Sequence, residues 1–223
     1  MSVPRPSKGG GIAIIYKNTL SPFVSLSHSL PFSHLSFEFA QLTFSHPQNH
    51  ITFACIYRPP PSTQNKLTNS MFFTDFDTLL DHYSSLTGKL VILGDFNFHY
   101  DQQDNPDTKR LCLSLRNHNL TQHVTQPTHQ RGHTLDWLVT RDNDLIVNTD
   151  ISTDLPSDHS AILATLNLPL PPKTKHPVTR RNIKRVDRSQ FLDDAKNLLS
   201  NTCLLYTSPS PRDGATSRMP SSA

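Results

Sequence analysis

Four short apolar segments are each bordered by a cluster of polar residues, and this pattern constrains the fold more than any other feature of the chain. The apolar run in VILGDFNFHYD, residues 91–101, ends at Asp95 and Asn97. The other clusters are Tyr57 after ITFACI, Asp136 in HTLDW, and Asp158 with His159 before AILATL. When several strands end on the same side of a sheet, their terminal side chains project into one mouth. The sequence therefore predicts a sheet with one polar, chemically active end.

Extended segments fill the first part of the chain. A glycine cluster leads into the apolar residues 12–16, which we interpret as an interior strand. Residues 35–44 alternate apolar and polar side chains, and the polar turn SHPQNH separates them from ITFACIY at residues 51–57. This arrangement predicts an antiparallel hairpin that stops at the prolines of YRPPP, because proline removes a ladder donor.

Two segments carry apolar residues at helical spacing. The first has an amphipathic stripe made of Leu67, Met71, Phe72, Phe76, Leu79, Leu80 and Tyr83. The second covers residues 108–120 and includes Leu111 and Leu115. Strands interrupted by two helices and polar loops predict an α+β fold, a mixed-sheet sandwich with helices outside.

A change of composition marks the end of the compact part. We divide the chain into an N-terminal remnant (residues 1–8), a main domain (9–168), a basic proline-rich linker (169–186), a short helix (187–202) and a tail (203–223). Asp187 followed by Gln190 has the spacing of a capping box for that helix. The tail has no periodicity and resembles a translated library adaptor rather than evolved protein, so it is excluded from functional reasoning.

Charge and cysteine content limit the classes of protein to which the chain can belong. The chain has 223 residues, 12 histidines and a formal net charge of +3, a basic balance that suits a polyanionic partner without demonstrating one. Its three cysteines are odd in number and far apart, so neither a disulfide framework nor a zinc knuckle is indicated. No stretch approaches the roughly 20 apolar residues of a membrane span, and the N-terminus lacks a secretion signal. We therefore expect a soluble intracellular protein.

Four motifs occur together in the order YRPP, GDFN, HTLDW and SDH. With this order and spacing they resemble the endonuclease/exonuclease/phosphatase family, especially the apurinic-type endonuclease domain of non-LTR (LINE-like) retrotransposons. The resemblance covers residues 9–168, and the joint occurrence is more specific than any single motif. It implies a four-layer α/β sandwich of two packed mixed sheets flanked by helices. It also implies a phosphodiester hydrolase that uses Mg²⁺ or Mn²⁺ to nick DNA.

The resemblance also implies a role for each strand-end residue. Asp95 would position or activate the attacking water, and Asn97 would contact the phosphate. Tyr57 would form a hydrogen bond near the scissile group. Asp136 would orient His159, whose imidazole would stabilise the charged transition state. Donors of this kind act more strongly in the transition state, because phosphoryl transfer develops negative charge there.

Metal binding is the point at which the sequence departs from the family. The resemblance gives Asp158 a part in metal or proton handling, with Asp95 as a second ligand. Family members also carry a strand ending in Asn and a strand ending in Glu, the principal metal ligand, before the glycine-rich segment. Residues 1–8 contain no acidic side chain, and we expect Glu38, in an alternating strand, to face solvent. We therefore expect an incomplete N-terminus, impaired activity and uncovered apolar surface.

Loop residues beside the motifs are candidate DNA contacts. Arg58 follows the Tyr57 strand end, while Arg131 and His133 precede the HTLDW strand. Contacts to the DNA backbone and a plain basic loop explain Arg131 and His133 equally well. Trp137 is interpreted as a core residue rather than a platform for bases.

Other polar residues receive no role from the sequence. His99 and Asp101 follow GDFN closely, but the resemblance does not include them, so they are interpreted as loop polarity. The scattered histidines, His129 among them, are interpreted as solvated. Each motif taken singly also has an ordinary explanation, since Gly, Asp and Asn favour turns for local backbone reasons.

Three functional hypotheses follow. The first is a metal-dependent DNA endonuclease of a mobile element, joined in the full element to a reverse transcriptase region and having access to the nucleus. The second is a catalytically dead remnant that binds nucleic acid through its basic loops. The third keeps the chemistry but changes the substrate to a phosphomonoester or a phospholipid head group. The sequence indicates no particular oligomeric state.

Overall fold

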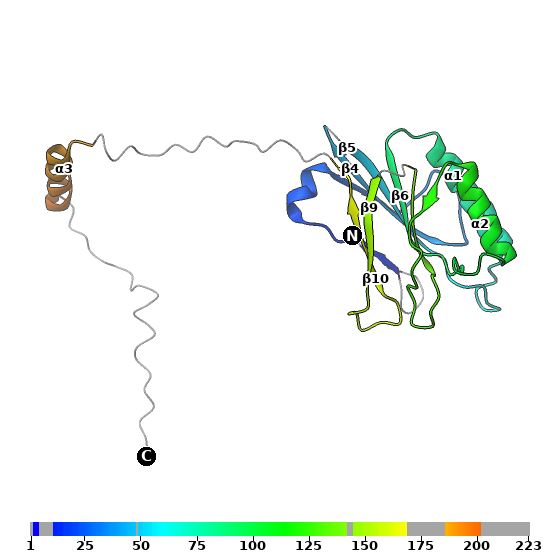
Figure 1. The fold of residues 1–223 in the computed structure, drawn as a ribbon. Helices are drawn as coiled ribbons and strands as arrows, with labels where there is room; N and C mark the ends of the chain where they lie inside the picture. The colour runs from blue at the N-terminus through cyan, green and yellow to red at the C-terminus, as the bar shows by residue number, and fades with distance from the viewer. Residues whose placement is uncertain (1, 5–10, 48, 142–144, 169–185, 202–223) are drawn as a thin grey trace, which may run out of the picture. The chain divides into compact units, whose positions relative to one another are not determined.

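The computed structural model of the protein describes residues 2–4, 11–47, 49–141, 145–168 and 186–201 (Figure 1). The chain divides into two compact units, residues 1–172 and 173–223. The predicted tail and nearly all of the predicted linker lie outside the described residues, so the domain boundaries stay predictions. Within the part of the chain that is described, no helix combines the length and apolar character needed to cross a bilayer.

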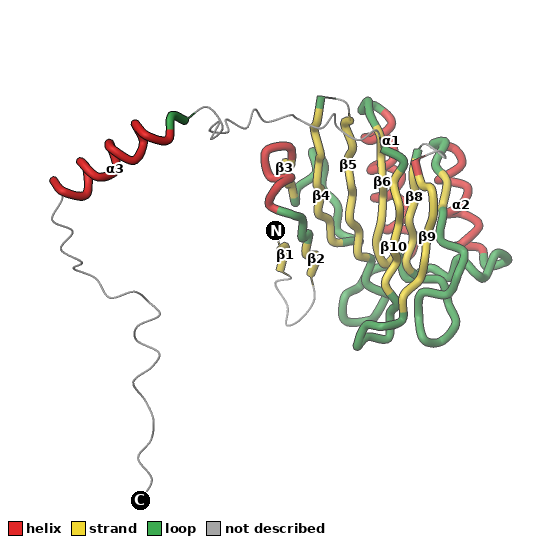
Figure 2. Tube along the Cα trace, turned by 60° about the vertical axis from the view of Figure 1, so that its left-hand side comes forward, coloured by secondary structure: helices red, strands yellow, loops and turns green. Residues whose placement is uncertain are grey.

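A six-stranded mixed sheet forms the centre of the first unit (Figure 2). In spatial order its strands are β3 (Val24–Ser27), β4 (Glu38–His46), β5 (Asn49–Tyr57), β6 (Lys89–Asp95), β8 (Asp136–Thr140) and β7 (Thr121–Gln122). The predicted hairpin is confirmed as β4 and β5, which pair antiparallel. Strands β5 and β6 pair in parallel, because α1 (Asn69–Ser84) carries the chain back to the same end of the sheet.

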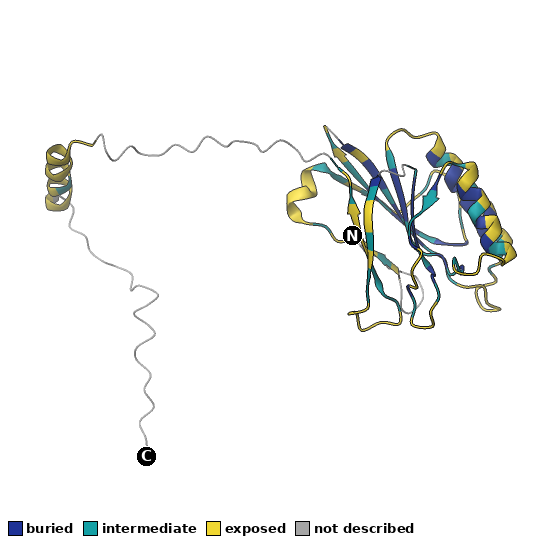
Figure 3. Cartoon of the chain, viewed as in Figure 1, coloured by how far each residue is buried: buried dark blue, intermediate teal, exposed yellow. Residues whose placement is uncertain are grey.

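Helices α1 and α2 (Pro106–Asn117) cover one face of this sheet. Figure 3 shows their buried residues on the side toward the strands. Aromatic side chains of α1 pack with strand residues and with Trp137, which is fully buried as predicted. Both predicted helices are confirmed. The second begins earlier than expected, because the Asn105 side chain accepts hydrogen bonds from the backbone N–H groups of Asp107 (2.9 Å) and Thr108 (3.4 Å).

A two-stranded antiparallel sheet, β9 (Ile146–Ser152) and β10 (Ala161–Leu166), packs on the other face. Figure 2 shows these strands and the helices on opposite sides of the six-stranded sheet. Ile151 and Ile162 contact a core cluster that contains Ile51, Val91 and Leu138. The predicted α+β class, with packed sheets and outer helices, is therefore confirmed.

The prediction of an interior strand over residues 12–16 is wrong. The structure has a short strand β2 (Gly11–Ala13), which pairs with β1 (Ser2–Pro4) in a separate two-stranded sheet. The Ile15 side chain is 94% exposed, because no layer formed by the described residues covers it. An apolar groove of about 440 Å³ lies nearby over β4 and β5, lined in part by Leu42, Phe44 and Phe53.

The second unit contains helix α3 (Arg188–Asn201). The Asp187 carboxylate accepts hydrogen bonds from the backbone N–H groups of Ser189 (3.0 Å) and Gln190 (3.3 Å). The Gln190 side chain donates to Asp194 (3.1 Å) along the helix. Asp187 thus caps the helix, whereas the Gln190 side chain is bonded to Asp194 rather than reaching back as the predicted capping box requires.

Gly94 occupies a position in the central sheet where a side chain would collide with the neighbouring strand. It lies in β6 with φ +141°, and a Cβ atom there would be 1.8 Å from the carbonyl oxygen of Ile56 on β5. Only glycine fits a contact of this kind, since the obstacle is backbone and cannot rotate away. Gly94 therefore sets how closely β6 approaches β5 immediately before Asp95.

We predict that Gly94→Ala lowers the free energy of unfolding by about 3 kcal/mol or more, since overpacking and backbone strain act together. Gly132→Ala is the matched control: φ there is +81°, and nothing lies within 4 Å of the added Cβ. Only backbone strain of about 1–2 kcal/mol is expected for the control. Urea unfolding measures both variants, and equal losses would contradict the steric argument.

Candidate active site

The pairing register of the central sheet places polar strand ends in one row. Glu38 of β4 is opposite Tyr57 of β5, Tyr57 is opposite Asp95 of β6, and Asp95 is opposite Asp136 of β8. Directly paired residues project from the same face of a sheet, here the face that packs on the second sheet. The structure thus brings three predicted site residues together. Glu38 joins the row as a half-buried side chain rather than the solvent-facing one expected.

Asp95 is held by Asn97 at the exit of β6. The backbone N–H of Asn97 donates to Asp95 Oδ1 (2.9 Å), and the Asn97 amide Nδ2 donates to Asp95 Oδ2 (3.0 Å). Asn97 adopts φ +50°, a left-handed conformation that asparagine tolerates better than most residues. The same Nδ2 group also donates to the carbonyl oxygen of Arg58 (2.8 Å). The GDFN turn therefore fixes the orientation of the carboxylate.

The electrostatic environment of Asp95 suits proton transfer. Burial and the nearby negative charge of Asp136 raise the pKa of Asp95 to about 6, although the hydrogen bonds from Asn97 oppose the shift. A carboxylate with a pKa near neutrality can accept a proton and release it again at physiological pH.

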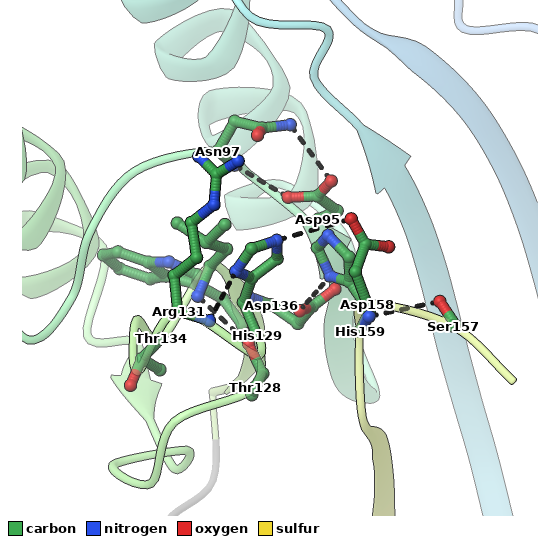
Figure 4. Close-up of polar contacts among 12 residues, drawn as sticks. Asp95, Asn97, Thr128, His129, Arg131, Thr134, Asp136, Ser157, Asp158 and His159 are labelled. Carbon is green, nitrogen blue, oxygen red and sulfur yellow. Dashed lines mark hydrogen bonds and ion pairs between the residues drawn. The ribbon is translucent and has the colours of Figure 1, made fainter. Parts of the chain in front are cut away.

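Asp136 and His159 form a close pair (Figure 4). His159 Nδ1 lies 2.8 Å from Asp136 Oδ2. Burial alone would lower the pKa of His159, but the hydrogen bond to Asp136 and the charges of Asp136, Asp95 and Asp158 together outweigh burial and raise that pKa above its ordinary value. With Nδ1 directed at the carboxylate, the second ring nitrogen is the one that can donate to a substrate. This contact is the one expected if Asp136 orients the His159 ring.

Thr128 anchors the start of β8. Its side chain is fully buried, and its Oγ1 atom accepts hydrogen bonds from the backbone N–H groups of Leu135 and Asp136, each at 3.1 Å. The chain approaching β8 is thereby tied to the turn that precedes it. The hydrogen bond to Thr128 fixes the backbone position of Asp136 in the row of strand ends. No sequence motif pointed to this role of Thr128.

His129 is a site residue that the sequence interpretation missed. Its ring centroid lies 4.9 Å from that of His159, and its Nε2 atom lies 3.5 Å from Asp158 Oδ2. The side chain is only 13% exposed, so its interpretation as a solvated histidine is wrong. His129 and His159 come together through an isolated β-bridge between two loops. No local sequence signal distinguishes His129 from the other histidines.

Asp158 lies at the open side of this group. A backbone hydrogen bond at Asp158, together with the nearby His159 and His129, holds the pKa of its carboxyl below the ordinary value. His129, Asp158 and His159 each offer a ligand atom within 4.8 Å of the others. Asp158 is therefore ionised and placed where it could help to hold a cation.

Arg58 does not have the position expected of a DNA contact. The residue is 2% exposed, and its guanidinium donates to the carbonyl oxygen of Phe96 (3.1 Å) and to the Asn69 side chain. The guanidinium also stacks 3.9 Å above the Phe98 ring. Burial lowers the pKa of Arg58 to about 10, opposed by the charges of acidic neighbours. Arg58 is a structural side chain that ties β5 to the GDFN turn.

The other two predicted DNA contacts lie on the turn before β8. Arg131 is exposed, and its backbone N–H donates to His129 Nδ1 (3.1 Å). Figure 4 shows the Arg131 side chain extending past His129 toward the Asn97 end of the site. His133 instead pairs with Asp101, its Nδ1 atom lying 3.0 Å from Asp101 Oδ2.

The strand-end residues fit the divalent cation that the resemblance implies. Asp95 and Asp136 are close enough for the charge of Asp136 to raise the pKa of Asp95, and a cation between carboxylates relieves such repulsion. Carboxylate oxygens are also the ligands that Mg²⁺ prefers.

The sequence profile of the endonuclease-reverse transcriptase family matches residues 51–163, half of the chain. The chain belongs to this family. The matched segment runs from β5 into β10 and contains all five predicted catalytic residues. The family description agrees with the retrotransposon-type resemblance of the motifs.

The solved structures that are similar to this chain share little sequence with it. An endonuclease/exonuclease/phosphatase family protein from Leptotrichia buccalis has 12% identity and a TM-score of 0.43, and covers 58% of this chain. The human Nocturnin catalytic domain with bound sulfate has 18% identity, a TM-score of 0.43 and 60% coverage. Beta toxin from Staphylococcus aureus has 13% identity, a TM-score of 0.41 and 57% coverage.

The chain spans just over half the length of these structures, covering 54%, 53% and 56% of them respectively. No curated protein matches it in sequence.

Asp95→Asn is predicted to stabilise the metal-free protein at pH 8 but not at pH 4. Because the folded-state pKa of Asp95 is raised, wild-type stability falls as pH rises from the ordinary aspartate value through about 6. Asparagine cannot ionise and so avoids this loss, on the order of 2–3 kcal/mol. Urea unfolding in the presence of a chelator measures the free energy of unfolding at both pH values, and the exposed residue variant Asp104→Asn is the control. A gain that is the same at both pH values would contradict the shifted pKa.

Asp136→Asn is predicted to lower the pKa of His159, because the hydrogen bond to Asp136 and its charge are lost while burial and the charges of Asp95 and Asp158 remain. NMR titration of the histidine ring signals measures this change. Asp158→Asn is the matched control, and its effect should be much smaller because that carboxylate is exposed. Similar shifts in both variants would show that Asp136 is not the dominant partner.

Proposed function

We propose that this chain is a metal-dependent phosphodiester hydrolase domain of the retrotransposon type, which nicks DNA. The observation that carries the proposal is the single row of Tyr57, Asp95 and Asp136, with His159 paired to Asp136 at its end. A proton acceptor, a phenol and an oriented imidazole on one face match the needs of in-line attack on a phosphate.

In the proposed reaction, Asp95 accepts a proton from the attacking water. The hydrogen bonds from Asn97 that orient the Asp95 carboxylate support this role. Asp95 and Asp158 would hold Mg²⁺ or Mn²⁺, which when bound supplies positive charge to the phosphate oxygens.

His159 would donate from its second ring nitrogen to the phosphate as negative charge develops. Its raised pKa favours the protonated form, which is the better donor. Tyr57 would add a hydrogen bond from the neighbouring strand. The Asn97 amide already donates to Asp95 and to the Arg58 carbonyl oxygen. A phosphate contact by Asn97 therefore requires one of these hydrogen bonds to break.

We further propose that residues 1–223 by themselves have low activity. No Asp or Glu precedes Glu38 in the sequence, so the acidic ligand expected before the glycine-rich segment is not supplied by residues 1–37. Loss of one positioned transition-state group costs about 10²–10³ in rate. Glu38 lies opposite Tyr57 at the end of the row of paired strand-end residues.

DNA is the proposed substrate and partner, which implies access to the nucleus and a reverse transcriptase region in the complete element. We call Tyr57, Asp95, Asp136 and His159 the catalytic row. Exposed Arg131, which lies beside His129 and this row, is the side chain best placed for a phosphate contact. The same basic turn supports the second candidate function, a domain that binds nucleic acid without cleaving it.

Nicking of supercoiled plasmid in the presence of Mg²⁺ tests the proposal. Slow nicking is expected, and both Asp95→Ala and His159→Ala should reduce its rate by about 100-fold or more. Asp104→Ala and His28→Ala remove exposed side chains of the same types and should leave the rate unchanged. Retained DNA binding without cleavage would support the binding domain. Cleavage that survives in both site variants would refute the assigned residues.

A further inference from the structure

A second group of potential metal ligands lies outside the catalytic row. His99 and Asp101 are on the loop after β6, and His133 is on the turn before β8. One ligand atom from each residue lies within 4.8 Å of the other two. None of the three has a part in the proposed hydrolysis. We refer to them as the His99–Asp101–His133 cluster.

The spacing within the cluster suits a shared cation. His133 Nδ1 lies 3.0 Å from Asp101 Oδ2, and the His99 and His133 rings have centroids 4.2 Å apart at 69°. Two ligands of one tetrahedral cation, with bonds of about 2.0–2.2 Å, lie roughly 3.3 Å apart. A small separation of the Asp101 and His133 side chains would therefore admit the ion.

Hydrogen bonds hold two members of the cluster in place. Asp101 Oδ1 accepts a hydrogen bond from the backbone N–H of Thr134 (2.9 Å), so Oδ2 is the oxygen that faces His133. The Thr108 hydroxyl donates to the carbonyl oxygen of His99 (3.1 Å) and fixes that backbone segment. Supporting bonds of this kind orient metal ligands before the metal arrives.

An ordinary Asp–His ion pair accounts for only part of the cluster. It explains Asp101 and His133 but leaves His99, whose Nδ1 atom is buried and has no hydrogen-bond partner among the described residues. A buried polar atom without a partner costs about 1–3 kcal/mol, so such atoms call for an explanation. A ligand that recruits the His99 ring to Asp101 and His133 supplies one.

The ionisation states of the cluster also suit metal binding. Burial and the neighbouring His133 lower the pKa of His99, which keeps its imidazole neutral. Burial would raise the pKa of Asp101, but hydrogen bonds from His133 and Thr134 outweigh it and keep the carboxyl ionised. Neutral imidazole and carboxylate are the forms that coordinate metals.

We propose that His99, Asp101 and His133 bind a divalent transition-metal ion of the Zn²⁺ type, with water completing the coordination. Two imidazoles and one carboxylate favour Zn²⁺ over Mg²⁺, which prefers oxygen ligands throughout. The bound ion ties the loop after β6 to the turn that carries His129 and Arg131. The backbone N–H of His129 donates to the carbonyl oxygen of His133 (3.0 Å), so the ion stiffens the rim of the catalytic row.

The test measures Zn²⁺ binding to the full chain, prepared without a histidine tag, by competition with a chromophoric chelator. Co²⁺ replaces Zn²⁺ in a parallel experiment, because its visible absorption reports the ligand set. His99→Gln and His133→Gln should each weaken Zn²⁺ binding by about 100-fold or more, at least as much as loss of a supporting residue. His28→Gln, an exposed histidine elsewhere, should leave the affinity unchanged.

His129→Gln separates the cluster from its neighbour. The group of His129, Asp158 and His159 could also take a cation, so binding that disappears in His129→Gln but survives in His99→Gln and His133→Gln overturns the proposal. Absence of Zn²⁺ binding by the wild type overturns it as well.

A second measurement covers variants that fail to fold. In wild-type protein labelled with ¹⁵N-histidine, Zn²⁺ should shift the ring nitrogen signals of His99 and His133 and leave that of His28 in place. Shifts confined to His129 and His159 would again place the ion in the other group. Neither readout depends on nuclease activity, so failure of the proposed function would not affect the result.

Discussion

The alignment of β5, β6 and β8 is the constraint on which the rest of the site depends. Backbone hydrogen bonds of the ladder fix Tyr57, Asp95 and Asp136 opposite one another, with no side-chain contact needed to hold the row together. Gly94 permits the close approach of β6 to β5 directly before Asp95. A slip of one residue would turn these side chains to the helix-covered face, where they would meet the aromatic core.

This alignment has an electrostatic cost that the surrounding groups partly offset. Two carboxylates project from adjacent strands, and the charge of Asp136, added to burial, raises the pKa of Asp95. Hydrogen bonds from Asn97 to Asp95, and the pairing of Asp136 with His159, oppose that repulsion. The same repulsion destabilises the folded protein when Asp95 is ionised and makes the row attractive to a cation.

Local pattern was informative where an element is long and periodic or where polar residues end an apolar run. The helices α1 and α2 and the β4–β5 hairpin follow from side-chain spacing, and the five catalytic candidates follow from the strand ends. Local pattern failed where exposure depends on distant parts of the chain. The apolar residues 12–16 indicated a buried strand, yet whether such a segment is buried depends on the layer that covers it, and Ile15 remains exposed.

The sequence by itself determined which residues end the strands and therefore which chemistry is available, because strand length and turn-forming residues act over a few positions. Only the tertiary structure decided that Arg58 is buried under Phe98, that His129 lies against His159, and that His99 meets His133. These contacts join segments separated by tens of residues. They depend on how the sheet and its loops pack in three dimensions, which no local pattern encodes.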